Sequence, residues 1–324
     1  MRAIEVTEHG GPDVLELVEL PNPQAAEGEV LIAVHAAGVN FIDTYLRAGM
    51  YPSTPRYVPG IEGCGEVIAV GEGVTHLTVG DRVAWCGGHS SYAEQVSLRA
   101  ELVVAVPAGV DSAIAGSSLL RGLTAHYLLD GSAHPRPGDT VLVHAGAGGV
   151  GQILTQWATA RGIRVITTVS TDEKEELSRA AGAAEVLRYG DHVAQAVRDL
   201  TDGRGVSVVY DGVGASTFEQ SLAATAVRGT IVLFGAASGP VPPFDLQRLN
   251  PAGSLSVTRP TLAHFVADPA EYAWRADEFF TAIGDGTLTV NVGQSFPLAA
   301  AADAHRALES RATTGSTMLS IAES

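Results

Sequence analysis

Gly146, Gly148 and Gly151 have the G-x-G-x-x-G spacing of a turn that holds the pyrophosphate of a dinucleotide. Such a turn must be tight, and the helix after it must pack closely on the strand before it. A β-rich run, Thr140–Val143, precedes the glycines, and apolar residues follow at helical spacing: Val150, Ile153, Leu154, Trp157 and Ala158. The pattern predicts phosphate binding at a helix N-terminus, against the alternative of an ordinary glycine-rich turn.

The side chains after the next predicted strand, 164–169, indicate which dinucleotide binds. NAD enzymes usually carry a carboxylate there, but this chain has the hydroxyl of Ser170. Lys174, the only lysine, lies near a predicted helix start, where a cation is disfavoured unless an anion such as a 2′-phosphate lies beside it. We therefore predict NADP(H). Ser170 and Glu173 also fit a capping box, and Lys174 could belong to a solvated face among acidic neighbours: Asp172, Glu173, Glu175 and Glu176.

Several common mechanisms lack their residues. A tyrosine four residues before the lysine is absent, since position 170 is serine, and no G-x-S-x-G motif occurs. Cys64 and Cys86 cannot form a four-cysteine zinc lobe. Histidines without close metal-ligand spacing are expected to be surface or hydrogen-bonded residues: His35, His126, His144 and His305. Direct hydride transfer remains, in which the cofactor carries the chemistry and the protein orients it.

The substrate side of such a site is predicted in the stretch 38–52. Asn40 can offer its amide to a carboxamide or a ribose, and Tyr45 or Tyr51 could donate to a carbonyl oxygen as charge develops on it. We therefore treat these three residues as catalytic candidates. The alternative is that both tyrosines are packing residues with an exposed hydroxyl. Asp43 and Arg47 lie in the same stretch.

The elements that must position these residues fall into two patterns. Short apolar runs broken by Gly, Pro and Asp extend to about residue 115 and predict an irregular β domain. From Thr140 onward, strands alternate with helices, which predicts a doubly wound parallel sheet with its ligand at the carboxyl ends of the strands. The further strands are expected at 165–169, 185–189, 206–211, 230–234 and 255–258. The tail, with helices at 270–283 and 299–309 and a strand at 317–321, is expected to fold back onto the first domain.

Composition limits the partners. The chain has 324 residues, 46% of them hydrophobic, which is enough for two domains with their own cores. The formal charge of −16 argues against nucleic acid or an anionic membrane as a partner. No secretory signal or run of eighteen apolar residues occurs, and two cysteines suggest a reducing compartment. We therefore expect a cytoplasmic protein.

The motifs together resemble the zinc-free NADPH:quinone oxidoreductases, the zeta-crystallin-like group of the medium-chain dehydrogenase/reductase superfamily. The resemblance covers almost the whole chain, in order and with matching spacing. The motifs that carry it are GVNFIDTYLRAGMYP, PGIEGCGEV, VGDRVA, LLRGLTAHYLL, VLVHAGAGGVG, TVSTDEK, YDGVG, LFGAASGPVPPFDLQRLN and ESRATTGS.

This resemblance implies an α/β protein with a Rossmann domain and a GroES-like β domain, NADPH in the cleft between them, and a homodimer. The GroES-like domain would comprise residues 1–117 and 260–324, and the Rossmann domain residues 118–259. Carried over by motif, the residues that bind NADPH would be Asn40, Gly146, Gly148, Gly149, Val150, Gly151, Ser170, Lys174, Tyr189, Phe234, Gly235, Ser238 and Arg311.

Departures from the family pattern concern the metal and two side chains. Zinc-dependent relatives have a cysteine where this chain has Asn40 and a histidine where it has Ile61, so a metal-free site is expected. Ser170 stands where some relatives have glycine, which would crowd the phosphate slightly. Arg121 stands where glutamine is common, and we expect it to be a solvated arginine rather than part of the site.

Three functions are consistent with these features. The first is reduction of a quinone or similar conjugated carbonyl by NADPH. The second is reduction of an enone or enoyl thioester with the same hydride geometry. The third, from a different class, is a non-catalytic, crystallin-like protein that binds NADPH. Turnover on quinone and enone panels would distinguish them.

Overall fold

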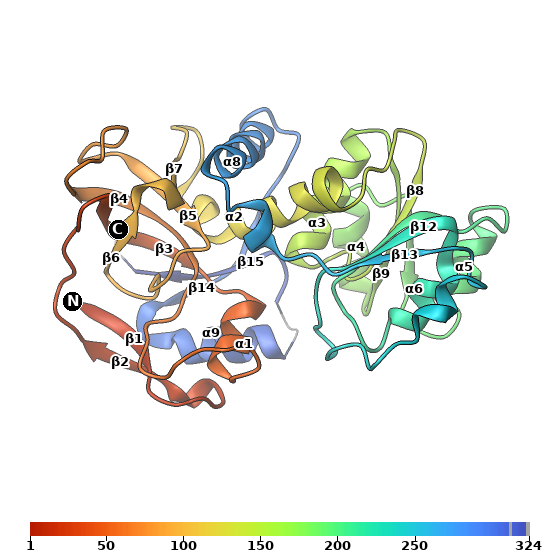
Figure 1. The fold of residues 1–324 in the computed structure, drawn as a ribbon, viewed down its shortest axis with the longest axis horizontal. Coiled ribbons are helices and arrows are strands. Elements are labelled where there is room, and N and C mark those ends of the chain that lie inside the picture. The colour runs from red at the N-terminus through yellow and green to blue at the C-terminus, as the bar shows by residue number, and fades with distance from the viewer. Residues whose placement is uncertain (311–312, 322–324) are drawn as a thin grey trace. The chain divides into compact units, whose positions relative to one another are not determined.

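The computed structural model describes residues 1–310 and 313–321, which form two compact units (Figure 1). The first unit comprises Met1–Leu120, Asp268–Asp285 and Val290–Ser324, and the second comprises Arg121–Ala267 and Gly286–Thr289. The sequence analysis predicted domain boundaries at 117/118 and 259/260, and these boundaries stay a prediction.

The second unit is built on a six-stranded sheet in which every neighbouring pair is parallel. The strand order is β10-β9-β8-β11-β12-β13, so the chain starts in the middle of the sheet, moves to one edge and then to the other. This order confirms the doubly wound parallel sheet. The strands are β8 (Thr140–Val143), β9 (Arg164–Val169), β10 (Glu185–Arg188), β11 (Val206–Asp211), β12 (Thr225–Leu233) and β13 (Ser256–Thr258).

Helices cover this sheet. Residues Leu142, Ile166, Val209 and Ile231 share one face of the sheet, where they form a core with apolar side chains of α5 and α6. Helices α3 and α4 contact one another and lie on the other face, as Figure 1 shows. The helices of this unit are α3 (Gly149–Ala160), α4 (Asp172–Ala180), α5 (Val193–Asp199), α6 (Phe218–Ala224) and α7 (Leu262–Phe265).

Two local expectations for this unit were wrong. The cap of α4 is Thr171, whose side chain accepts a hydrogen bond from Lys174 N, whereas Ser170 is exposed and does not cap the helix. The fifth strand begins at Thr225 rather than Thr230, because the chain pairs with β11 at Val206 before a register shift.

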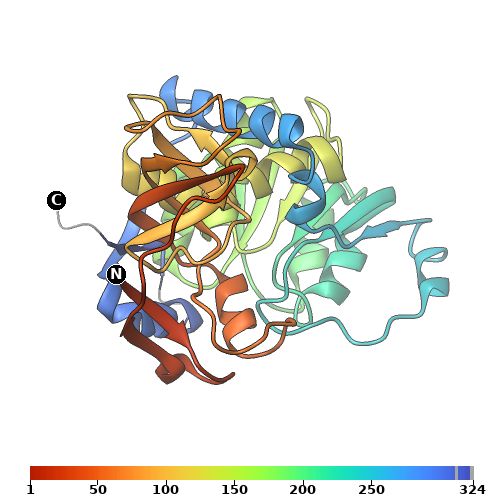
Figure 2. The same cartoon turned by 60° about the vertical axis from the view of Figure 1, so that its left-hand side comes forward.

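The first unit contains an antiparallel pair, β1 (Arg2–Val6) with β2 (Leu15–Glu19), and a larger sheet of seven strands. Figures 1 and 2 show the blue strands of the chain end in this unit, and β15 pairs antiparallel with β3. The tail therefore returns to the first domain, as expected. The larger sheet comprises β3 (Glu29–Gly38), β4 (Glu62–Val70), β5 (Arg82–Cys86), β6 (Gln95–Arg99), β7 (Val103–Ala105), β14 (Val292–Pro297) and β15 (Ser316–Ser320).

Three helices lie largely or wholly in the first unit, α1 (Phe41–Arg47), α8 (Pro269–Gly284) and α9 (Ala301–Glu309), and α2 (Ser112–Tyr127) passes from one unit into the other along the chain. The core of the first unit combines apolar residues of its strands with Ala301, Ala304 and Leu308 of α9. Among the residues that the structure describes, no helix is both long and apolar enough to span a membrane.

Candidate functional site

The glycine turn joins β8 to α3, and each of its glycines meets a different structural requirement. A Cβ on Gly146 would lie 2.5 Å from the Cβ of Thr167 on β9, so a larger residue would push the turn away from the sheet. A Cβ on Gly151 would collide with the backbone oxygen of Ala145, so this glycine lets α3 pack on the turn. Gly148 is the N-cap residue, with an extended conformation.

The start of α3 fits a pyrophosphate group. The helix has twelve residues, and its first four, Gly-Val-Gly-Gln, carry no charge that would compete with an anion. Gly148, Gly149 and Val150 are half-buried, so their backbone remains partly accessible. Free N–H groups and the helix dipole make such a terminus attractive to phosphate. The predicted roles of these residues therefore agree with the local geometry, although they stay predictions.

A network of buried hydrogen bonds fixes His144, the residue that precedes the glycine turn. The hydroxyl of Ser221 donates to Asp211 at 2.7 Å, so its oxygen accepts from His144 Nε2–H at 3.0 Å. The unprotonated Nδ1 of His144 then accepts from the Thr168 hydroxyl at 2.8 Å. Burial lowers the pKa of His144, which keeps the imidazole neutral. His144 is a hydrogen-bonded residue, as expected.

Tyr189 is held between this network and the glycine turn. Its ring stacks on His144 with 6.3 Å between centroids, and its hydroxyl oxygen accepts from Ala145 N–H at 2.9 Å. Ala145 follows β8 by two residues and has a positive φ of 56°, which is uncommon for a residue other than glycine. The tyrosine predicted to bind the 2′-phosphate is therefore fixed directly to the dinucleotide turn.

The predicted adenosine end lies where β9 and β10 finish side by side. Val169 pairs with Arg188, so Ser170 and Tyr189 follow adjacent strand ends. Lys174 is half-buried in the first turn of α4. Ser170, Lys174 and Tyr189 therefore lie close to the carboxyl ends of β9 and β10.

Arg188 is a cation at this edge that the sequence analysis missed. Its Nη1 donates to Thr171 O at 2.6 Å, and its Nη2 pairs with Asp172 at 2.5 Å and Glu175 at 2.8 Å. It therefore neutralises two of the carboxylates that surround Lys174. The signal available in the sequence was an arginine at the last residue of a strand, immediately before Tyr189.

Phe234, Gly235 and Ser238 follow β12 and pack on the turn that follows β11. Phe234 N donates to Asp211 O at 2.9 Å, and Ser238 N and Oγ both donate to Val213 O at 2.8 Å. The structure therefore places these predicted nicotinamide-edge residues at the carboxyl end of the sheet, the edge where ligands bind in such folds.

Asn40 belongs to the first unit, at the start of α1. It forms a capping box with Asp43, in which Asn40 N–H donates to Asp43 Oδ2 at 2.8 Å. Its side-chain Nδ2 donates to Glu62 Oε1 at 2.7 Å, and Glu62 Oε2 accepts from Leu120 N at 2.8 Å. Glu62 is fully buried and fixes which end of the amide is the nitrogen. The amide has a second N–H, and the amide as a whole is the group that the sequence analysis predicted to serve a carboxamide or a ribose.

A chain of buried hydrogen bonds continues from Asp43 into α9. Tyr92 Oη lies 3.3 Å from Asp43 Oδ2 and 3.2 Å from His305 Nε2. Arg47 Nη1 donates to His305 Nδ1 at 3.1 Å, and its Nη2 pairs with Glu309 at 2.5 Å. Burial, with help from the Arg47 charge, lowers the pKa of His305 to about 3. The neutral imidazole therefore accepts from Arg47 and donates to Tyr92.

Tyr45 and Tyr51 lie against one another near α1, with an edge-on ring contact of 5.4 Å between centroids. Tyr45 is half-buried, and Tyr51 and the neighbouring Met50 are exposed. This arrangement is compatible with the packing role and with the catalytic role, so the catalytic assignment stays a prediction.

The expectation that Arg121 is a solvated arginine was wrong, because only 7% of the residue is exposed. The sequence analysis missed its burial because helical periodicity shows which residues share a face but not that a glycine elsewhere leaves room for a long side chain. Arg311 lies outside the described residues.

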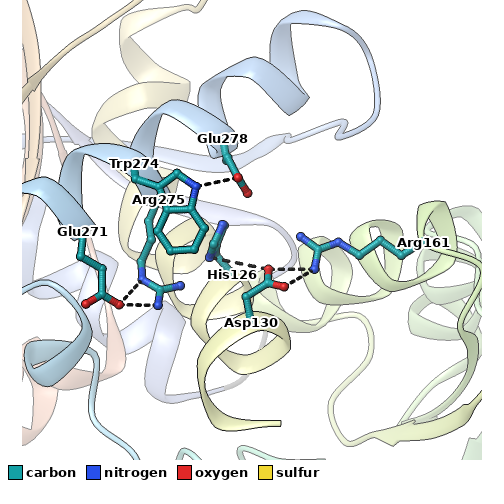
Figure 3. A network of polar contacts seen from close by, with 7 residues as sticks. All are labelled: His126, Asp130, Arg161, Glu271, Trp274, Arg275 and Glu278. Carbon is teal, nitrogen blue, oxygen red and sulfur yellow. Dashed lines mark hydrogen bonds and ion pairs between the residues drawn. The ribbon is translucent and has the colours of Figure 1, made fainter. Parts of the chain in front are cut away.

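Figure 3 shows ion pairs away from the glycine turn. In the second unit, Arg161 binds both carboxylate oxygens of Asp130 at 2.7 Å, and His126 Nδ1 lies 3.8 Å from the same carboxylate. In the first unit, Arg275 pairs with Glu271 along α8, and the Trp274 indole donates to Glu278 at 2.7 Å.

Known families match both parts of the chain. The model for the alcohol dehydrogenase GroES-like domain matches residues 26–130, and the model for zinc-binding dehydrogenases matches residues 149–279. A quinone oxidoreductase from Pseudomonas aeruginosa is 45% identical over 98% of this chain and 99% of that protein.

Solved structures give the same result. A mycobacterial protein in complex with NADPH is 57% identical, with a TM-score of 0.96 over 98% of this chain and 99% of that one. The Escherichia coli quinone oxidoreductase in complex with NADPH is 40% identical, with a TM-score of 0.96 and the same coverage.

The Rossmann sheet, its glycine turn and the GroES-like unit define an oxidoreductase of the medium-chain dehydrogenase/reductase superfamily. Within that superfamily, the chain belongs to the quinone oxidoreductase family.

Proposed function

We propose that this protein is an NADPH-dependent quinone reductase that works without a metal ion. The observation that carries the proposal is full-length similarity to quinone oxidoreductases, at 41–45% identity, in a chain whose glycine turn keeps the geometry for a dinucleotide. Bound NADPH supplies the hydride.

The residues of the chain then bind and orient the reactants. The glycine turn, with the start of α3, binds the pyrophosphate. Ser170, Lys174 and Tyr189 bind the 2′-phosphate, and Phe234, Gly235 and Ser238 border the nicotinamide. Asn40, with its amide oriented by Glu62, donates its second N–H on the nicotinamide side. Tyr45 and Tyr51 offer hydroxyls to the carbonyl of the quinone.

The decisive experiment is a cofactor and acceptor panel with the purified protein. We expect oxidation of NADPH, followed at 340 nm, to depend on added quinone and to be faster than with NADH. Binding of NADPH without turnover on any quinone would refute the substrate assignment and would favour the non-catalytic, crystallin-like alternative.

A second candidate substrate is a conjugated carbon–carbon double bond. A 2-haloacrylate reductase from Burkholderia is 39% identical over 98% of both chains, and an acrylate offers such a bond. The same acceptor panel therefore includes a 2-haloacrylate and simple enones. Turnover with these acceptors but not with quinones would select the enone-type reductase.

We also propose that the protein is a cytoplasmic homodimer, as the family resemblance implies. The low cysteine content supports the compartment, and it does not predict the oligomer. Light scattering at micromolar concentration tests the dimer, for which the mass of two 33.5 kDa chains is expected.

A further inference from the structure

Arg188 connects the two segments that carry the proposed ligands of the 2′-phosphate. It is the last residue of β10, immediately before one of these ligands. Its Nη1 donates to Thr171 O at 2.6 Å, and its Nη2 pairs with Asp172 Oδ1 at 2.5 Å. The other two ligands are Ser170 and Lys174, and both contacts of Arg188 lie between them in the chain. Arg188 therefore reaches the segment between β9 and α4 from the end of the neighbouring strand.

Asp172 is unfavourable for a phosphate at this place. Its side chain is fully exposed at the first residue of α4, and Glu173 and Glu175 lie in the same turn. A phosphate monoester carries a charge of about −1.5 to −2 near pH 7, so each carboxylate there repels it. A carboxylate after the second strand of such a sheet also suits the ribose hydroxyl of NAD. On its own, Asp172 would therefore favour NADH.

The two carboxylates that pair with Arg188 depend on it to different degrees. Glu175 lies 2.8 Å from Arg188 Nη2 and 2.8 Å from Arg179 Nη2, so it keeps a cationic partner when either arginine is lost. A substitution at Arg188 therefore acts mainly through Asp172.

We propose that Arg188 sets the preference of this protein for NADPH over NADH by neutralising Asp172. It is a positioning residue, because its guanidinium is directed to the Thr171 carbonyl and to two carboxylates. Lys174 then attracts the 2′-phosphate, and Arg188 removes the charge that opposes it. The inference rests on the proposed function, because it needs NADPH at this edge of the sheet.

The test measures equilibrium binding of NADPH and NADH to the purified protein at low ionic strength. We expect Arg188→Gln to weaken NADPH by about three- to tenfold and to leave NADH nearly unchanged, as one unpaired carboxylate near a phosphate implies. Glutamine keeps an N–H donor for Thr171 O, so the variant removes the charge alone. At about 1 M salt the loss should disappear, because exposed charges are then screened.

A second substitution separates this electrostatic role from a structural one. Asp172→Asn in the Arg188→Gln background removes the carboxylate that the arginine neutralised, so NADPH should bind within about twofold of the wild type. A purely structural role of Arg188 would leave the double variant as weak as the single one, and this result would overturn the proposal.

Arg164→Gln is the matched control. Arg164 lies at the first residue of β9, at the opposite end of the same strand pair, where it pairs with Glu185. Its side chain is 36% exposed and that of Arg188 is 34% exposed. Arg164→Gln should bind both cofactors as the wild type does.

Two further results would overturn the role of Arg188: unchanged NADPH affinity in Arg188→Gln, or an equal loss for NADPH and NADH. Should Arg188→Gln fail to fold, Asp172→Asn alone carries the test, because this side chain is fully exposed. It should bind NADPH about two- to threefold more tightly with NADH unchanged, and wild-type affinity for NADPH would refute the proposal. A wild-type protein that bound neither cofactor would overturn the proposed function too, whereas a wild type that prefers NADPH confines the failure to Arg188.

Discussion

At the scale of single residues, the site depends on side chains whose partners fix their orientation. Glu62 decides which end of the Asn40 amide is the nitrogen, and His144 holds the ring of Tyr189. Residue type predicted Asn40 as a ligand-binding residue, and the family resemblance predicted Tyr189 as one. They could not predict Glu62 as the partner of Asn40, because the two residues are 22 positions apart and meet only through neighbouring strands and a helix start.

Lys174 provides the sharpest test of cofactor choice. We expect Lys174→Ala to weaken NADPH by about ten- to hundredfold while leaving NADH nearly unchanged, because only NADPH has the 2′-phosphate that we propose this ammonium group binds. Fluorescence titration with both cofactors measures the difference. Arg179→Ala, in the last turn of the same helix, is the control and should alter neither affinity. An equal loss for both cofactors in Lys174→Ala would mean that this lysine does not distinguish them.

His305 should make the stability of the first unit depend on pH. Its pKa is about 3 in the folded protein and about 6.5 when unfolded, so below pH 6.5 the unfolded chain binds a proton that the folded chain does not. Stability is therefore complete above pH 6.5 and falls as the pH falls toward 3. Between pH 7 and pH 5, this one group should account for a loss of about 2 kcal/mol.

Urea unfolding of wild type and His305→Gln at pH 7, 6 and 5 measures this effect. Glutamine can accept from Arg47 and donate to Tyr92 but does not titrate, so the variant should lose less stability on acidification. Parallel pH profiles for the two proteins would rule out a buried neutral His305.

At the scale of elements, helix α4 begins at a different residue from the one that the local sequence pattern suggested. The sequence predicted the helix and its acidic first turn, but the cap is Thr171 and not Ser170. Both residues carry a hydroxyl group and both are favoured at the N-cap, so residue propensity could not distinguish them. The choice depends on where β9 ends, and strand ends depend on pairing with β8 and β10 rather than on residue type.

The capping assignment predicts different effects for two neighbouring hydroxyls. Thr171→Ala should lower the free energy of unfolding by about 1 kcal/mol, because Lys174 N loses its acceptor. Ser170→Ala, measured by the same urea unfolding without cofactor, should leave stability unchanged. If the two variants exchanged these outcomes, the helix would begin one residue earlier than the structure shows.

At the scale of the whole molecule, the two ends of the chain build one unit. Strand β15, close to the C-terminus, lies between β14 and β3, and Leu319 is fully buried opposite Ala37. The return of the tail to the first domain follows from the family resemblance. The register of β15 does not, because a strand of five residues has several alternatives of similar hydrophobic pattern.

Truncation of that late strand's buried side chain should therefore destabilise the first unit. We expect Leu319→Ala to lower the free energy of unfolding by about 2 to 5 kcal/mol, as a cavity in a packed core does. Ser320→Ala, at the exposed neighbouring position, should change it by less than about 0.5 kcal/mol. Guanidinium unfolding followed by circular dichroism compares them. Similar stabilities would show that β15 is not part of the core.

The sequence by itself determined the fold class, the strand and helix alternation, the dinucleotide turn and the family, because these depend on periodicity and on short motifs that are local in the chain. Only the tertiary structure decided that Glu62 orients Asn40, that Arg188 lies beside Asp172, and that Arg121 is buried against Gly149. Each of these contacts joins distant segments, and each depends on the space that neighbouring residues leave. Packing therefore buried an arginine that the sequence analysis predicted to be solvated.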